Sequence, residues 1–118
     1  MDRQTMDLAE RRAADRSLSE QRGDARRDYV RYSEQEADAD REYEVTRARV
    51  YMEKRHAGAT DRESELACRE AAADPKHRRD IAHSMARASL LRISEIERKS
   101  VTVRDLHATS ERIDGLAA

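Results

Sequence analysis

Apolar and small side chains recur at helical spacing between residues 74 and 115, the longest regular pattern in the chain. The stripe consists of Ala82, Met85, Ser89, Ile93, Ile96, Ser100, Val103, Leu106, Ser110 and Ile113. Asp74 and Pro75 are the residue types of an N-cap and a first helical position, and Gly115 suits a helix C-terminus. The pattern predicts one long helix over residues 74–115, whose small serines allow the close approach of a partner helix.

A second stripe, with alternating steps of three and four residues, predicts another long helix from about Asp24 to Ala57, ended by Gly58. Its positions are Tyr29, Tyr32, Glu36, Ala39, Tyr43, Thr46 and Val50. From Tyr43 onward Val45, Ala48 and Met52 add a further stripe, so we expect that part to be covered from two sides. Glu36 is the polar exception, and we expect it at a wet edge or paired with an arginine of the facing helix.

The turn between the long helices carries a specific helix-start signal. Thr60 and Glu63 have the spacing of a capping box, which predicts a short helix that runs through Ala73. Proline at 75 disfavours helical geometry at Asp74, so a break there is favoured over a bent continuation.

These elements predict an all-α fold: an antiparallel hairpin of two long helices with a short helix between them, coiled-coil-like in its packing. The composition agrees, because 42% of the 118 residues are charged and 19 of the 44 apolar residues are alanine. Two helices cannot enclose a core, since each leaves half of its stripe open. We therefore expect a homo-oligomer.

Residues 1–24 carry few apolar anchors. Met6, Leu8 and Leu18 are isolated among charges, and Gly23 interrupts the pattern. The composition still favours helix, so we interpret this segment as weakly ordered or partner-dependent, with a solvated tail as the alternative. Residues 25–118 then form the hairpin domain.

The residue types that carry catalysis or bind metals are sparse. His56, His77, His83 and His107 lie outside any zinc-type spacing, and Cys68 has no base at motif spacing and no cysteine to pair with. A glycine-rich phosphate loop is absent from the sequence. We expect a non-enzymatic protein without metal or cofactor. The N-terminus lacks an apolar signal segment and no run is long enough for a membrane span, so we expect a cytoplasmic protein.

Charge shifts along the chain, from a net −3 over residues 1–40 to a net +3 over residues 75–118. Basic side chains of the last segment are candidate phosphate contacts: Lys76, Arg78, Arg79, Arg87, Arg98, Lys99 and Arg104. Acidic residues interrupt this set and no aromatic residue lies among them. A solvated face that pairs with the acidic N-terminal half is the favoured interpretation.

From about Arg41 to Ala118 the chain resembles small all-helical proteins encoded by tailed bacteriophages. The resemblance rests on the segments Arg41-Glu42-Tyr43, Gly58-Ala59-Thr60-Asp61-Arg62-Glu63, Asp74 with the helix after it, and Val103-Arg104-Asp105-Leu106-His107-Ala108. It implies a long helix, a turn, a short helix and a second long helix, in proteins often encoded near replication and recombination genes. It implies no functional residue.

We therefore expect a phage-type helical interaction or assembly protein that acts in the host cytoplasm by binding itself and a host or phage protein. The alternative is a nucleic-acid-binding accessory protein of replication or recombination that uses the basic residues of the last helix. The residues expected at the oligomer or partner seam are Tyr29, Tyr32, Tyr43, Val50, Met85, Ile93, Ile96, Val103, Leu106 and Ile113.

Overall fold

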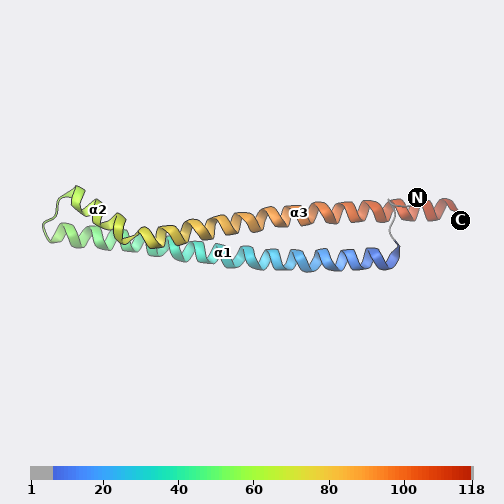
Figure 1. Ribbon diagram of the computed structural model, residues 1–118, viewed down its shortest axis with the longest axis horizontal. Helices are drawn as coiled ribbons and strands as arrows, with labels where there is room; N and C mark the ends of the chain where they lie inside the picture. Colours follow the sequence, from blue (N-terminus) through green and yellow to red (C-terminus); the bar gives the residue numbers. More distant parts are fainter. Residues whose placement is uncertain (1–6, 118) are drawn as a thin grey trace. The chain divides into compact units, whose positions relative to one another are not determined.

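The computed structural model describes residues 7–117, which form three helices and contain no strand (Figure 1). They are α1 (Leu8–His56), α2 (Asp61–Ala71) and α3 (Ala73–Ala117). The predicted all-α hairpin, with a short helix between two long ones, is confirmed. The contacts divide the chain into two compact units: Met1–Asp28 with Ala88–Ala118, and Tyr29–Arg87.

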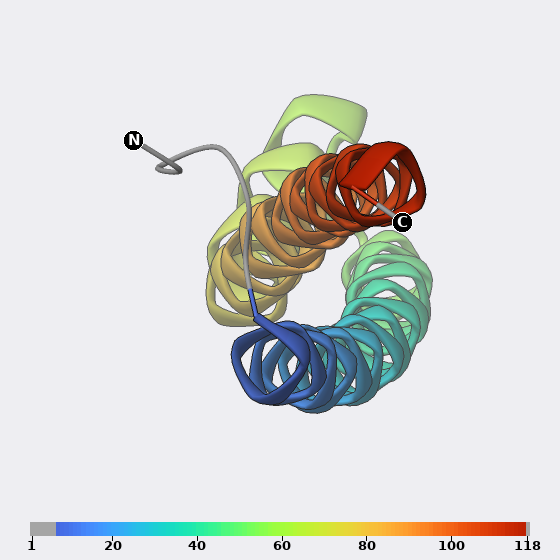
Figure 2. The same cartoon turned by 90° about the vertical axis from the view of Figure 1, so that its right-hand side faces the viewer.

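The first unit is a two-helix layer formed by the start of α1 and the second half of α3 (Figure 2). Its core contains Leu18, Ala25 and Ile96, against which Ile93 and Val103 pack. The polar contacts beside this core run in opposite chain directions: Arg22 Nη2 donates to Ser100 Oγ at 3.0 Å, Arg26 lies 3.9 Å from Glu97, and Asp28 lies 3.8 Å from Arg92. The two helical segments of this unit are therefore antiparallel, as predicted.

The second unit packs all three helices around small side chains. Ala39, Ala72, Ala82 and Ala86 are each at most 5% exposed, as are Ser64 and Cys68 of α2. Small side chains leave space for helix backbones to approach one another closely. Glu36 does have a partner on the facing helix, but it is His83 Nδ1, 2.8 Å from Glu36 Oε2, and not an arginine.

Helix α1 starts well before the expected Asp24. Asp7 caps it, because its side chain accepts a hydrogen bond from the Glu10 N–H at 2.8 Å. Gly23 lies inside the helix, where it costs backbone entropy without ending the helix. Residues 1–6 lie outside the described part, and a requirement for a partner in residues 1–24 stays a prediction.

The turn after α1 is a Schellman motif followed by a capping box. Gly58 has φ +95°, its N–H donates to Arg55 O, and the Ala59 N–H donates to Lys54 O, each at 3.0 Å. The Thr60 hydroxyl then accepts from the Glu63 N–H at 3.2 Å, and the Glu63 carboxylate accepts from the Thr60 N–H at 3.4 Å. The predicted capping box is confirmed.

The break between α2 and α3 falls at Ala72, not at Asp74. Pro75 is tolerated in the first turn of α3, since the amides of that turn have no partner within the helix. Asp74 therefore lies inside α3 and is not its N-cap, and its carboxylate accepts from Arg78 Nε at 3.0 Å. Helix α3 also continues past Gly115 to Ala117, so the predicted C-terminus is two residues short.

Candidate functional site

The expected seam residues differ in how deeply they are buried. Ile96 is 2% exposed, whereas Met85 and Ile113 are 41% and 49% exposed. The other seven are half-buried: Tyr29, Tyr32, Tyr43, Val50, Ile93, Val103 and Leu106. Their role in an oligomer or partner contact stays a prediction.

Met85 is exposed because the buried face of α3 follows a heptad. Ala82, Ser89 and Ile96 are buried at seven-residue spacing. Ala86 and Ser100, each four residues after one of these positions, are also buried. The sequence pattern predicted that Met85 would lie in the stripe, but its neighbour Ala86 is the residue that is buried. Serine 110 of the predicted stripe has a side chain outside the described residues.

Among the described residues, the second stripe on α1 is covered only in part. Val45, Ala48 and Met52 are exposed. Helix α2 lies beside this stripe, since Ala48 and Met52 line an open hollow with Glu65 and Cys68 of α2. It contacts α1 through Arg47, which lies 3.6 Å from Glu65, and through Tyr51, whose hydroxyl donates to Asp61 at 2.8 Å. This last bond raises the pKa of Tyr51.

Two of the candidate phosphate contacts are already paired with acids. Arg78 lies 2.8 Å from Glu42 and 3.0 Å from Asp74, and Arg79 Nη1 donates to Asp40 at 3.1 Å. Hydrogen bonding to these carboxylates raises the pKa of both arginines, and the bond from Arg78 lowers the pKa of Glu42. These two side chains stabilise the contact between α1 and α3 in the second unit.

The other five candidates are exposed and make no ion pair with another residue that the structure describes. They are Lys76, Arg87, Arg98, Lys99 and Arg104. Lys76 and Arg87 belong to the second unit and the remaining three to the first.

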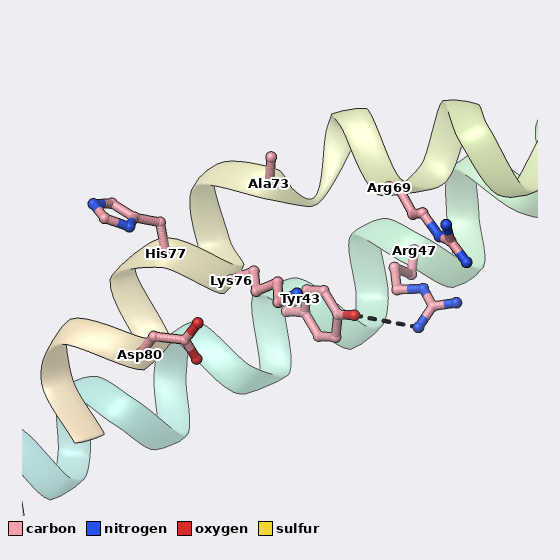
Figure 3. Close-up of a pocket in the computed structure, with 7 residues that line it drawn as sticks. All are labelled: Tyr43, Arg47, Arg69, Ala73, Lys76, His77 and Asp80. Atoms are coloured by element: carbon pink, nitrogen blue, oxygen red, sulfur yellow. Dashed lines mark hydrogen bonds between the residues drawn. The ribbon is translucent and has the colours of Figure 1, made fainter. Parts of the chain in front are cut away.

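Lys76 lines an open groove of about 610 Å³ in the second unit, where α1, α2 and α3 meet (Figure 3). We call it the Tyr43 groove. It is lined by Tyr43, Arg47, Arg69, Ala73, Lys76, His77 and Asp80.

The central ring of the Tyr43 groove is held by two arginines. Arg47 Nη1 donates to the Tyr43 hydroxyl at 3.2 Å, and the guanidinium carbon of Arg79 lies 4.7 Å from the ring centroid. Hydrogen bonding to the Cys68 thiol, and secondarily to the Tyr43 hydroxyl, raises the pKa of Arg47. The Tyr43 side chain and Arg47 are thereby fixed relative to α2.

Positive charge is in excess around this groove. Arg69 and Lys76 form no ion pair with any described residue, whereas Asp80, the acidic residue in the lining, already accepts from Arg79 at 3.4 Å. The groove therefore presents unneutralised cations beside a positioned aromatic ring. Chemically, such an arrangement binds anionic groups by charge-assisted hydrogen bonds.

Arg47 and Arg69 were not among the residues selected from the sequence. The expected phosphate contacts all lie on the last helix, whereas Arg47 lies on α1 and Arg69 on α2. The i, i+4 spacing of Tyr43 and Arg47 was a visible signal for their pairing. No local pattern in the sequence indicated which face of α2 contacts α1. The position of Arg69 in the groove therefore could not be predicted.

The Cys68 thiol and the His107 imidazole make local contacts. Cys68 is 1% exposed and its Sγ donates to Glu65 O at 3.2 Å, while His107 Nε2 lies 2.8 Å from Glu111 Oε1. Among the described residues no three His, Cys, Asp or Glu side chains come together in a way that would hold a metal ion. Within residues 7–117, no helix combines the length and apolar character that spanning a membrane requires.

Comparison of the chain with models of protein families, with curated proteins and with solved structures gives no match.

Proposed function

We propose that this chain is a non-enzymatic, phage-type helical interaction or assembly protein, which acts in the host cytoplasm by associating with copies of itself and with a partner protein. The phage class is supported by the sequence resemblance of residues 41–118. The association is supported by the distribution of the larger hydrophobic side chains.

That distribution carries the proposal. Among the described residues, the large aliphatic side chains that are buried are Leu18 and Ile96, and the rest of the buried apolar set is alanine and Cys68. Twelve large hydrophobic side chains are instead 41–88% exposed: Leu8, Val30, Val45, Met52, Leu66, Ile81, Met85, Leu90, Leu91, Val101, Ile113 and Leu116.

Burial of apolar surface stabilises by roughly 25 cal/mol per Å², so alanine contributes little and the larger side chains contribute most. Apart from Leu18 and Ile96, the buried apolar side chains of the described residues are small, and the twelve large ones named above are exposed. Association would remove the large ones from water, which is the physical reason to expect it. Single exposed hydrophobics are ordinary, but pairs such as Ile81 and Met85, four residues apart on one helix face, form a continuous surface.

The mass of the protein in solution tests the proposal. We expect light scattering at micromolar concentration to give a multiple of the 13.6 kDa chain mass. A 13.6 kDa species that melts cooperatively and independently of concentration would contradict it.

A nucleic-acid-binding accessory role is the second candidate. It is favoured by Arg87, Arg98, Lys99 and Arg104, which are exposed and bind no carboxylate of the described residues. Phosphate binding by several such side chains gives an affinity that falls steeply with salt. Titration of single- and double-stranded DNA between about 50 and 200 mM salt tests this role, and binding that does not depend on salt would contradict it.

A further inference from the structure

We infer that the Tyr43 groove binds an acidic segment of a partner polypeptide, with Arg69 and Lys76 pairing with its carboxylates. The inference deepens the proposed interaction role, on which it rests, by naming the chemistry of the partner and the surface that receives it.

The first argument is charge. Arg69 and Lys76 contribute two positive charges with no acidic partner among the described residues, and Asp80 is engaged by Arg79. Two neighbouring cations on α3 are matched with acids, Arg78 with Glu42 and Arg79 with Asp40, whereas Arg87 of the same unit pairs with no described acid but lies outside the groove. Arg69 and Lys76 differ from the other unpaired cations of this unit in that they line a hollow, which is the arrangement that attracts an anionic partner.

The second argument is spacing. Arg69 comes from the last turn of α2 and Lys76 from the first turn of α3, on opposite sides of the helix break. Figure 3 shows Arg69 near Arg47 at one end of the groove and Lys76 beside Tyr43. Their separate positions, in a groove of about 610 Å³, suit a ligand with several spaced charges better than one small anion.

The third argument distinguishes a polypeptide from a nucleic acid. Binding of single-stranded nucleic acids depends on aromatic rings that stack on bases. Tyr43 is the aromatic residue in this groove, and guanidinium carbons of Arg79 and Arg47 already lie 4.7 and 5.7 Å from its ring centroid. Carboxylates need cations and amide donors but no stacking platform, so an acidic peptide matches what the groove offers.

The frame that holds these cations is built into the hairpin. The capping box starts α2, buried Cys68 fixes its inner face, and Arg47 lies 3.6 Å from Glu65. The backbone of Arg69 is therefore positioned before a partner arrives, which reduces the entropy cost of binding.

The test measures fluorescence anisotropy of a labelled hexaglutamate peptide with the full chain at about 50 mM salt, where exposed charges are weakly screened. The groove variant combines Arg69→Gln and Lys76→Gln. Its matched control combines Arg41→Gln and Lys54→Gln, which removes the same charge from exposed positions outside the groove.

We expect the groove variant to bind the peptide roughly 3- to 30-fold more weakly than the unaltered chain, as the loss of two exposed ion pairs implies. The control variant should stay within about twofold of the unaltered chain. Equal losses in the two variants would show general attraction by net charge, and would overturn the inference. Absence of hexaglutamate binding by the unaltered chain would also overturn it.

A labelled six-nucleotide single-stranded DNA separates the two polyanions. Tighter binding of this DNA than of hexaglutamate, with the same sensitivity to the groove variant, would assign the groove to nucleic acid and overturn the inference. Circular dichroism and light scattering on each variant separate the inference from the proposed self-association. A monomeric chain whose groove binds the peptide would contradict self-association alone, whereas an oligomer indifferent to the groove variant would contradict the groove alone.

Discussion

Ile96 is the large aliphatic side chain that the hairpin buries most completely, at 2% exposure. It packs in the first unit with Leu18 and Ala25. We expect Ile96→Ala to lower the free energy of unfolding by roughly 2–5 kcal/mol, because the cavity it leaves has few neighbours able to fill it. Urea denaturation measures this change.

Leu91→Ala is the matched control, because Leu91 is 65% exposed in the same helix. Its unfolding free energy should change by less than about 0.5 kcal/mol in a folded monomer. A silent Ile96→Ala together with a destabilising Leu91→Ala would show that the buried face of α3 is misassigned.

The ion pair of Arg78 with Glu42 makes stability depend on pH. The hydrogen bond from Arg78 holds the pKa of Glu42 below its ordinary value of 4.5 in the folded chain. A carboxylate with a lowered folded pKa stabilises the fold above its unfolded pKa, and this contribution is lost as pH falls through the folded pKa. We expect Glu42→Gln to lower Tm at pH 7 and to leave Tm at the acid end, below the folded pKa, nearly unchanged.

Thermal melts in a series from pH 7 into the acid range check this, because the Tm difference between the variant and the unaltered chain should shrink as pH falls. Glu44→Gln is the control, because Glu44 is exposed and forms no ion pair with a described residue. If Glu44→Gln showed the same pH-dependent change in Tm as Glu42→Gln, the change would be due to net charge and not to the pair with Arg78.

At the scale of single elements, α2 is short and depends on its N-terminal cap. Thr60→Ala removes the acceptor of the Glu63 N–H and the partner of the Glu63 carboxylate. We expect a loss of roughly 0.5–2 kcal/mol in unfolding free energy. Thr60→Ser keeps the hydroxyl and should retain most of the stability; an equal loss in both variants would mean that the cap is not the cause.

Helix α1 offers a stabilising substitution at Gly23. A Cβ there would meet only the end of the flexible Arg27 side chain, at 3.5 Å or more. Gly23→Ala should therefore raise the unfolding free energy by roughly 0.5–1 kcal/mol, as alanine loses less backbone entropy in a helix. No gain would indicate that the segment around residue 23 is not helical in solution. Gly58→Ala should do the opposite, because its φ of +95° strains any residue with a Cβ.

The elements that could be predicted from the sequence were those determined by residues adjacent in the chain. The turn at Gly58 and the cap at Thr60 depend on neighbouring residues only, and both appear in the structure. The break before α3 was displaced because proline fits a first helical turn as well as it ends a helix. Helix α1 extends back to Leu8 because packing of Leu18 and Ala25 against Ile96 offsets a sparse local pattern.

The candidate site was less predictable than the elements. The choice between Met85 and Ala86 depends on how the helix supercoils, since a period of 3.5 and one of 3.6 select different neighbours over several turns. Arg69 joins Arg47 and Lys76 only through the face that α2 presents to α1. Such juxtapositions come from tertiary packing, which no sequence period records.

At the scale of the whole molecule, most of the buried apolar side chains are small, and twelve large ones of the described residues are exposed. The continuous pair in the second unit is Ile81 and Met85, which are 50% and 41% exposed on one face of α3. Arg78 lies next to this face, and its ion pair with Glu42 holds a polar side chain at the border of the apolar surface. A polar rim around an apolar centre is the usual anatomy of a contact between proteins.

The last prediction tests this face directly. Ile81→Glu combined with Met85→Glu should convert the oligomer to a 13.6 kDa species by light scattering, because it places two charges in the centre of the proposed contact. Both side chains are exposed, so circular dichroism should show unchanged helix content in the monomer. Leu91→Glu is the control on another face of the same helix and should leave the mass unchanged. If Leu91→Glu dissociates the protein and the double variant does not, the self-association surface must include Leu91 and not the pair of Ile81 and Met85.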